Sequence, residues 1–356
     1  MPLQHDITNF SEDALAGWFQ KHNIETYRAG QVLRWIYHRN VHSFSQMTDL
    51  SKDLRDRLSR KLTISRLEPV QVQASIDGSK KYLFRLQDGH HIESVLIPGR
   101  SHWTLCVSSQ VGCSLGCKLC LTGRGGFVRN LEPAEIVGQI CAVQKDHTHP
   151  NPLTNIVFMG MGEPLVNYDR VVQAIGIITS NNGLQFSKRR VTLSTAGVVP
   201  AIDHLGRDVT VNLAVSLNAA DNKTRNELMP INRTYPIETL LAGCRRFPLP
   251  ARRMITFEYV LIAGVNDGPE DAKRLARLLK PLRAKVNLIP FNPFEGSEFK
   301  RPEETAVLAF QKVLVDRHFT ATVRQSKGGD IGAACGQLRA KRASVEEKSA
   351  ELEIPS

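Results

Sequence analysis

Three closely spaced cysteines carry the clearest chemistry of this chain. They lie in the run Gly112-Cys-Ser-Leu-Gly-Cys-Lys-Leu-Cys120, with three residues between the first pair and two between the second. Thiolates hold iron–sulfur clusters, and three of them can bind a four-iron cluster whose fourth iron has no protein ligand. An open iron can bind a substrate, much as the open position of a catalytic zinc does. The spacing therefore predicts a catalytic [4Fe-4S] cluster with Cys113, Cys117 and Cys120 as its ligands.

Two other interpretations of this run stay open at the level of sequence. A three-thiolate zinc site could be completed by a histidine such as His102. Disulfide bonding fits less well, because three clustered cysteines cannot all pair among themselves. The arrangement thus favours metal chemistry over a structural cross-link.

Length and composition are those of a globular protein. The chain has 356 residues, of which 42% are hydrophobic and 23% charged, enough for one large core and a small accessory domain. The first residues, MPLQHDITNFSEDALAGW, lack the basic segment and apolar stretch of a secretion signal. No apolar run is long enough to cross a bilayer. We therefore expect no membrane partner and a cytoplasmic location, where clustered cysteines indicate metal binding or catalysis.

The charge balance points to a polyanionic partner. Lys and Arg number 46 against 35 Asp and Glu, a formal charge of +11, and RNA is the leading candidate. One helix is expected near residues 50–62, where leucines recur every four positions. Its other face carries Lys52, Arg55, Arg57, Arg60 and Lys61. This stripe is either a phosphate-binding surface or the solvated side of an amphipathic helix.

The remaining elements divide the chain into regions. Residues 1–65 are expected to form short helices, with Ser11 as an N-cap before an acidic first turn. Residues 81–86 and 91–97 are expected to pair as a β-hairpin through Asp88-Gly89. Further strands are predicted around residues 105–107, 156–159, 191–193, 211–215, 255–261, 286–289 and 319–323, and helices at 133–143, 271–282 and 303–315.

This alternation of strands and helices predicts a parallel sheet with helical crossovers. Fewer than eight such units indicate an open, partial barrel, whose site should form where the strands end. The three-cysteine run follows the first of these strands, as such a site requires. The charged tail from Lys341 onward is expected to be frayed or disordered.

Four motifs make the chain resemble a known family. They are Cys106-Val-Ser-Ser-Gln-Val-Gly-Cys113, Gly126-Phe-Val-Arg-Asn-Leu131, Gly160-Met-Gly-Glu-Pro-Leu165 and Gly329-Asp-Ile-Gly-Ala-Ala-Cys-Gly-Gln-Leu338. Together with Tyr27–Tyr37 and Met47–Ser51, they resemble the RlmN/Cfr family of radical S-adenosylmethionine (SAM) RNA adenine methyltransferases. The resemblance implies an α/β fold with a partial (β/α)6 barrel. It divides the chain into a helical RNA-binding domain (1–65), a hairpin linker (66–98), the radical SAM core (99–340) and a tail (341–356).

The resemblance also implies catalytic roles. The cluster binds SAM and yields a 5′-deoxyadenosyl radical. Cys335 would accept a methyl group from a first SAM and become S-methylcysteine. Cys106 would release the product by attacking the Cys335 sulfur in a transient disulfide. Glu93 would accept a proton.

SAM contacts are implied for residues at the ends of several strands: Gly162, Glu163, Ser194, Ser216, Leu217, Asn218 and Asn292. Two positions depart from common patterns. Leu119 stands where many radical SAM enzymes have an aromatic residue before the third cysteine, and Asn218 where some relatives have histidine.

The implied reaction is methylation of C2 of an adenine in the peptidyl-transferase region of 23S rRNA, and of the adenine next to the anticodon in tRNA, using two SAM per turnover. A flavodoxin or ferredoxin system would donate electrons to a monomeric enzyme. Two alternatives remain: methylation of C8 of the same rRNA adenine, and an RNA-binding protein whose zinc or iron–sulfur site is purely structural.

Overall fold

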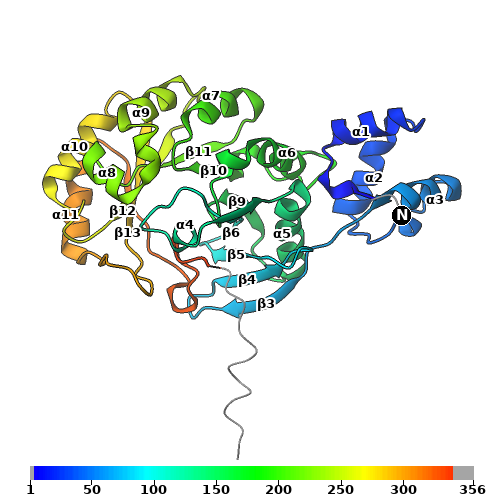
Figure 1. Cartoon of the computed structure of the whole chain (residues 1–356), viewed down its shortest axis with the longest axis horizontal. Helices are drawn as coiled ribbons and strands as arrows, with labels where there is room; N and C mark the ends of the chain where they lie inside the picture. Colours follow the sequence, from blue (N-terminus) through cyan, green and yellow to red (C-terminus); the bar gives the residue numbers. More distant parts are fainter. Residues whose placement is uncertain (1–3, 340–356) are drawn as a thin grey trace, which may run out of the picture.

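One ten-stranded sheet forms the centre of this computed structural model, which describes residues 4–339 (Figure 1). The strands lie in the order β14-β13-β12-β11-β10-β9-β6-β5-β4-β3. Their bounds are β3 Pro69–Ala74, β4 Lys80–Arg85, β5 His91–Pro98, β6 Trp103–Cys106, β9 Leu153–Phe158, β10 Val191–Thr195, β11 Asn212–Ser216, β12 Ile255–Leu261, β13 Ala284–Pro290 and β14 Ala321–Val323.

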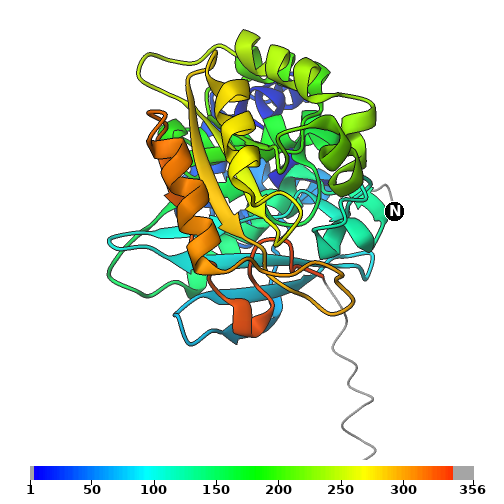
Figure 2. The same cartoon turned by 90° about the vertical axis from the view of Figure 1, so that its left-hand side faces the viewer.

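Strands β6 and β9 to β14 are all parallel, and helices connect them. The connecting helices are α5 Pro133–Asp146, α6 Tyr168–Thr179, α7 Val199–Asp208, α8 Asn222–Leu228, α9 Ile237–Arg246, α10 Pro269–Leu279 and α11 Glu304–Val315. They cover the outside of the curved sheet (Figure 2). The expected partial barrel is thus confirmed.

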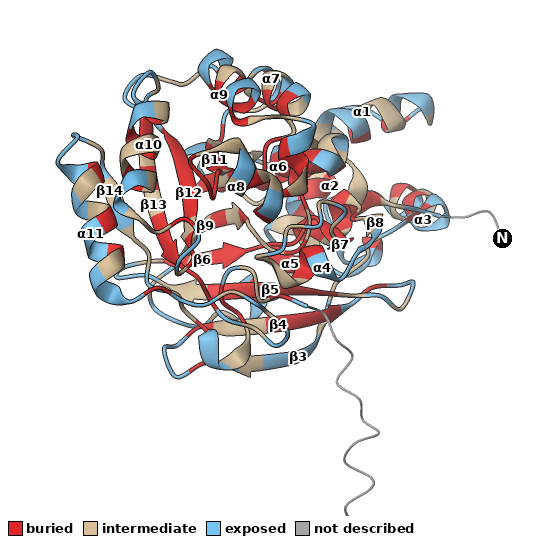
Figure 3. Cartoon of the chain, turned by 60° about the vertical axis from the view of Figure 1, so that its left-hand side comes forward, coloured by how far each residue is buried: buried red, intermediate tan, exposed pale blue. Residues whose placement is uncertain are grey.

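Burial follows the strand pattern. The strands of the parallel sheet are mostly buried, whereas each helix is buried along one side and exposed along the other (Figure 3). Apolar side chains such as Ile156, Leu213 and Phe257 are fully buried in one large core. This burial explains why the strands read as continuous apolar runs.

The predicted hairpin is present, but it is part of the main sheet. Strands β4 and β5 pair antiparallel, β3 adds to β4, and β5 pairs with β6 of the barrel. Val95 faces Cys106 across this last pairing. The segment therefore continues the barrel sheet instead of serving as a separate connector, because backbone groups at the β6 edge find partners there.

The N-terminal helices pack around a second core. Helices α1 Glu12–Lys21, α2 Arg28–Tyr37 and α3 Lys52–Lys61 bury residues including Phe19, Ile36 and Leu58. The Ser11 side chain accepts a hydrogen bond from Ala14 N, so this predicted N-cap is confirmed. The short strands β1 His5–Asp6 and β2 Leu62–Thr63 pair beside the helices. The 3-10 turns η1 Ile7–Asn9 and η2 Phe44–Gln46 complete this region.

The basic stripe of α3 is divided by its contacts. Arg55 donates to Ser45 O (2.7 Å) and Arg57 to His22 O (2.9 Å), so both guanidinium groups contact backbone carbonyls. Lys52, Arg60 and Lys61 are exposed, although Arg60 Nε also donates to Asp56 O (3.1 Å). Only the exposed part of the stripe is therefore open to a partner.

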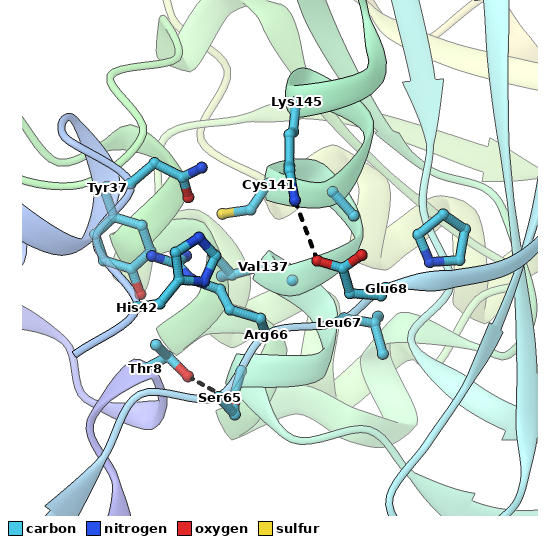
Figure 4. Close-up of a pocket in the computed structure, with 15 residues that line it drawn as sticks. Thr8, Tyr37, His42, Ser65, Arg66, Leu67, Glu68, Val137, Cys141 and Lys145 are labelled. Carbon is cyan, nitrogen blue, oxygen red and sulfur yellow. Dashed lines mark hydrogen bonds and ion pairs between the residues drawn. The ribbon is translucent and has the colours of Figure 1, made fainter.

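A small cavity of about 40 Å³ lies between the N-terminal helices and α5 (Figure 4). Cys141, Tyr37 and Arg66 face it, and an ion pair between Glu68 and Lys145 (3.2 Å) lies at one side. Burial raises the pKa of the Cys141 thiol to about 11, which keeps the thiol protonated. The cavity thus lies where the N-terminal region packs against α5 of the barrel.

Two further points concern membrane spans and the C-terminal tail. No helix within residues 4–339 has the length and apolar character of a membrane span. The tail predicted to be frayed, 341–356, lies outside the described residues.

Candidate active site

A cavity of about 170 Å³ opens where the parallel strands end. Residues at the ends of β9, β10, β11, β12 and β13 line it, together with the loop after β6 and the C-terminal segment. Ten of the site residues predicted from the sequence face this one space: Cys113, Cys117, Cys120, Gly162, Glu163, Ser194, Ser216, Asn218, Asn292 and Cys335. Glu93, Cys106 and Leu217 do not line it.

The three-cysteine loop is shaped by a small hairpin. Strand β7 (Gln110–Gly112) pairs antiparallel with β8 (Phe127–Asn130), and the loop between them contains the short helix α4 (Leu121–Arg124). Gly112 has φ +75°, and a Cβ there would lie 2.0 Å from Gly126 O. Only glycine fits this crossing, which directs the chain into the loop.

The donor set fits a cluster better than a single metal ion. Burial raises the pKa of Cys113 to about 11 and also raises those of Cys117 and Cys120. Cys120 adds to the shifts of Cys113 and Cys117, and Cys335 adds to that of Cys120. Such buried thiolates need positive charge beside them. Among residues 4–339 no group of three or more His, Cys, Asp or Glu side chains could hold a metal ion. A zinc would need its ligands to converge on one point, whereas a four-iron cluster has a separate iron for each thiolate.

His102 cannot complete a zinc site with these thiols. Its carbonyl accepts a hydrogen bond from Gly99 N (2.8 Å) just before β6 begins. The three-cysteine loop follows the other end of that four-residue strand, about 13 Å further along. The zinc interpretation that used His102 therefore finds no support in the residues that line the cavity.

The C-terminal segment brings Cys335 to the three-cysteine loop. Leu121 N donates to Gly336 O (2.7 Å), and Thr122 Oγ1 donates to Leu338 O (2.6 Å). Gly336 has φ +84°, and a Cβ there would lie 2.9 Å from Leu119 O. Glycine thus permits the close approach that places Cys335, whose own carbonyl accepts from Asn292 Nδ2 (3.2 Å), at the cavity.

Cys106 is buried in β6, behind the cavity wall. Its pKa is raised to about 12, first by burial and then by the neighbouring Cys335, while the Arg324 guanidinium opposes the shift. The Cys335 thiol therefore lies near enough to Cys106 to affect the pKa of Cys106. All seven cysteines are free thiols.

Glu93 lies beside the C-terminal segment. Its carboxylate pairs with Lys81 Nζ (3.4 Å) and accepts a hydrogen bond from Arg339 N (2.9 Å). Burial raises its pKa, and the Lys81 charge opposes this. Glu93 can therefore hold a proton near the segment that carries Cys335.

The Gly160–Glu163 turn places a buried carboxylate at the end of β9. A Cβ on Gly162 (φ +98°) would lie 2.4 Å from the Gln110 Cβ, so the turn requires glycine. Glu163 accepts hydrogen bonds from Leu165 N (3.1 Å) and Ala196 N (2.7 Å). Burial nevertheless raises its pKa. A cationic amino group at the cavity would offset this burial.

Asn218 has φ +56° and uses its side chain within the protein. Its Oδ1 accepts from Val260 N (2.9 Å), and its Nδ2 donates to Met229 Sδ (3.2 Å). Ser194 and Ser216 lie at the ends of β10 and β11, as expected. The buried Leu217 contributes its carbonyl, which accepts from Arg225 Nε (3.0 Å).

Arg225 was not recognised from the sequence. It is fully buried, and its other nitrogens donate to Ala196 O (2.7 Å), Ser216 O (3.2 Å) and Asn232 Oδ1 (2.8 Å). The guanidinium thus ties together the ends of β10 and β11. Burial lowers its pKa to about 10, and the group still provides the positive charge near Cys117. No sequence signal distinguishes it from other arginines on amphipathic helices.

Arg324 and Glu258 were also missed. Both line the cavity, and one carboxylate oxygen of Glu258 is buried without a hydrogen-bond partner among residues 4–339. The neighbouring Cys335, Glu258 and Cys106 raise the pKa of Arg324. The cavity therefore contains a cation beside the Cys335 thiol, and the same cation lies near Cys106 behind it. Arg324 directly follows β14, and Glu258 is a charged residue inside the apolar run of β12; these were the available sequence signals.

Comparisons with known proteins agree with this geometry. Residues 5–64 match the family model described as the ribosomal RNA large subunit methyltransferase N-terminal domain, and residues 107–279 match the radical SAM superfamily. A dual-specificity RNA methyltransferase RlmN from Desulfosudis oleivorans is 56% identical over 95% of this chain and 91% of the relative.

Two further relatives extend the comparison over almost the whole chain. The dual-specificity RNA methyltransferase RlmN of Geobacter sulfurreducens is 53% identical over 99% of this chain and 97% of its own length. The crystal structure of a radical SAM methyltransferase from Sphaerobacter thermophilus covers 95% of this chain and all of its own, with 44% identity and a TM-score of 0.88.

Proposed function

Because this chain belongs to the RlmN family of radical SAM RNA methyltransferases, we propose that it methylates C2 of adenine in 23S rRNA and in tRNA. The target in rRNA lies in the peptidyl-transferase region and the target in tRNA next to the anticodon. The observation that carries this proposal is the contact between the Cys335 segment and the three-cysteine loop at one cavity. A methyl carrier beside a radical source is what this reaction needs.

The cavity residues divide into two sets. Cys113, Cys117 and Cys120 would hold a [4Fe-4S] cluster that, when bound, supplies the electron for cleaving SAM to a 5′-deoxyadenosyl radical. Residues at the strand ends would bind SAM, with the turn at Gly162 and Glu163 near its amino group. The remaining contacts would come from Ser194, Ser216, Leu217, Asn218 and Asn292.

Cys335 serves as the methyl acceptor. C2 of adenine is an electron-poor carbon, so it cannot attack the electrophilic methyl of SAM as an oxygen or nitrogen nucleophile would. A thiolate at Cys335 can, and the fixed Arg324 cation favours that anion. Loss of a hydrogen atom from the resulting S-methyl group leaves a carbon radical that can add to C2.

Cys106 would release the product from the covalent adduct. Its thiolate attacks the Cys335 sulfur, a disulfide forms, and the carbon–sulfur bond breaks. The bond's electrons leave with the methylene carbon, which takes up a proton and becomes the new methyl group. The C2 hydrogen of the adduct leaves as a proton, and the unpaired electron would return to the [4Fe-4S] cluster, which supplies one electron for SAM cleavage when bound. A thiol reductant then restores both cysteines. Glu93 would act as the proton acceptor from its position beside the C-terminal segment.

The proposal also covers the domains, the electron donor, the oligomeric state and the cellular compartment. We assign residues 1–65 to an RNA-binding domain, 66–98 to the hairpin region and 99–340 to the core. An acidic flavodoxin or ferredoxin would supply electrons to a monomeric enzyme. A reducing cytoplasm suits a reaction that needs free thiols at Cys106 and Cys335.

Mass spectrometry of nucleosides tests the proposal. A strain lacking the gene should lack 2-methyladenosine in 23S rRNA and tRNA, and expression of the chain should restore it. Formation of 8-methyladenosine would instead support the C8 alternative. Absence of any methylation and of SAM cleavage by the reduced protein would support a structural metal site.

A further inference from the structure

A strongly basic groove lies at the end of the barrel opposite the catalytic cavity. It has a volume of about 460 Å³ and is formed by the segments that precede β12, β13 and β14. Its cationic side chains are Arg252, Arg253, Lys280, Arg283 and Arg317, with His318 beside them. Met254, Leu282 and Phe319 provide apolar surface, and no carboxylate lines it.

The groove cations lack acidic partners. Within residues 4–339 none of them forms an ion pair, whereas other exposed cations do, such as Arg246 with Asp203 (2.7 Å) and Lys312 with Asp316 (2.9 Å). Arg253 Nη1 is buried without a hydrogen-bond partner in the described part of the chain. Unpaired like charges repel one another, so this arrangement costs stability unless an anion binds.

The backbone conformation also indicates that this groove binds an anion. Arg252 and His318 have φ angles of 63° and 64°, a region that side chains other than glycine seldom adopt. Strained positions of this kind concentrate at functional sites. Both residues lie at the rim of the groove.

The basic surface continues along the same edge of the sheet. Lys188, Arg189 and Arg190 precede β10 and are all exposed. Strands β12 to β14 lie side by side in the sheet (Figure 3), so their first residues form one continuous edge. The partner that fits this edge is an extended polyanion rather than a small anion.

We propose that this groove binds the phosphate backbone of the RNA substrate at a segment remote from the target adenine. Arginine forks match phosphate oxygens, and four of the five groove cations are arginines. An acidic electron donor is a poorer occupant, because the seven-residue β13 separates the groove from the cavity by about 20 Å. The inference rests on the proposed function, since it takes RNA as the substrate. It further implies an RNA large enough to reach both ends of the barrel, as 23S rRNA is.

A charge-matched pair of variants tests the groove in the full chain. The first variant combines Arg252→Gln, Lys280→Gln and Arg317→Gln. The control combines Lys145→Gln, Arg246→Gln and Lys312→Gln, which also removes three positive charges, but from cations already paired with carboxylates. Affinity is measured at several salt concentrations with two RNA probes: an unmodified transcript of the rRNA domain that contains the target, and the target hairpin alone. Polyglutamate serves as a third probe that represents an acidic protein. Thermal unfolding reports whether each variant is folded.

The groove variant should bind the long transcript about 10- to 30-fold more weakly than the control at low salt. Its salt slope should fall by about 2, the contribution of three lost phosphate contacts. The loss for the short hairpin should be much smaller.

Three results would overturn the inference. If both triple variants bound the long transcript alike while the wild-type chain bound and methylated it, only the groove assignment would fail. If the wild-type chain bound neither RNA, the proposed function would fail as well. Normal RNA binding by the groove variant, with loss of binding to polyglutamate, would reassign the groove to an acidic protein.

Discussion

Replacement of Arg225 by methionine should weaken SAM binding although Arg225 does not line the cavity. The side chain is fully buried and makes four hydrogen bonds to the backbone and to Asn232. Two of its acceptors, Ala196 O and Ser216 O, lie where β10 and β11 reach the cavity. Ala196 also donates its N–H to Glu163 (2.7 Å). Loss of Arg225 would therefore loosen the backbone that holds both the carboxylate and the strand ends.

The size of the effect follows from these four bonds. A hydrogen bond to a charged group contributes about 1.5–3 kcal/mol, so the gross loss is about 6–12 kcal/mol. Methionine also removes a buried cation, and its desolvation penalty is several kcal/mol. The net loss in the free energy of unfolding should be about 3 kcal/mol. If half of this free-energy loss weakens the strand ends that bind SAM, the Kd for SAM should rise about tenfold.

Anaerobic titration of the reconstituted protein with SAM measures the affinity, and urea unfolding measures the stability. Arg225→Lys is the matched control, since it keeps the charge and loses the planar fork, and it should give an intermediate result. Asn232→Ala removes a single partner and should cost about 1 kcal/mol. An unfolding midpoint and a SAM affinity for Arg225→Met equal to those of wild type would refute this reasoning.

Three further predictions concern product release and RNA binding. Cys106→Ala should accumulate protein cross-linked to RNA through Cys335 on a denaturing gel, and Cys335→Ala should form no adduct; rapid turnover by Cys106→Ala would exclude its role in release. The pKa of Cys106 is raised to about 12, so its thiolate fraction should rise about tenfold per pH unit near neutrality. The single-turnover rate of product release should rise in the same proportion. A flat pH profile of that rate would count against a thiolate nucleophile. The double variant Lys52→Gln/Lys61→Gln should bind RNA more weakly and with a smaller salt slope. Its rate of SAM cleavage without RNA should equal that of wild type. An unchanged salt slope would show that the exposed face of α3 is only solvated surface.

Local sequence patterns predicted much of the fold. The apolar runs at residues 255–261 and 286–289 predicted strands that the structure places at Ile255–Leu261 and Ala284–Pro290. Such runs are informative because a strand covered on both faces is apolar at most positions. The spacing of the three cysteines likewise indicated metal chemistry, since those ligands are neighbours in the sequence.

The tertiary structure decided which distant residues meet. Cys335 lies more than 200 positions after the three-cysteine loop, and its place there depends on the Gly336 carbonyl that Leu121 N contacts. The hairpin became part of the main sheet because the β6 edge required a partner, which no local pattern reveals. Arg225 looks in the sequence like any arginine of an amphipathic helix, and only packing buries it beneath the strand ends. Sequence periodicity records which face of an element is buried, whereas the contacts between elements depend on how those faces pack together.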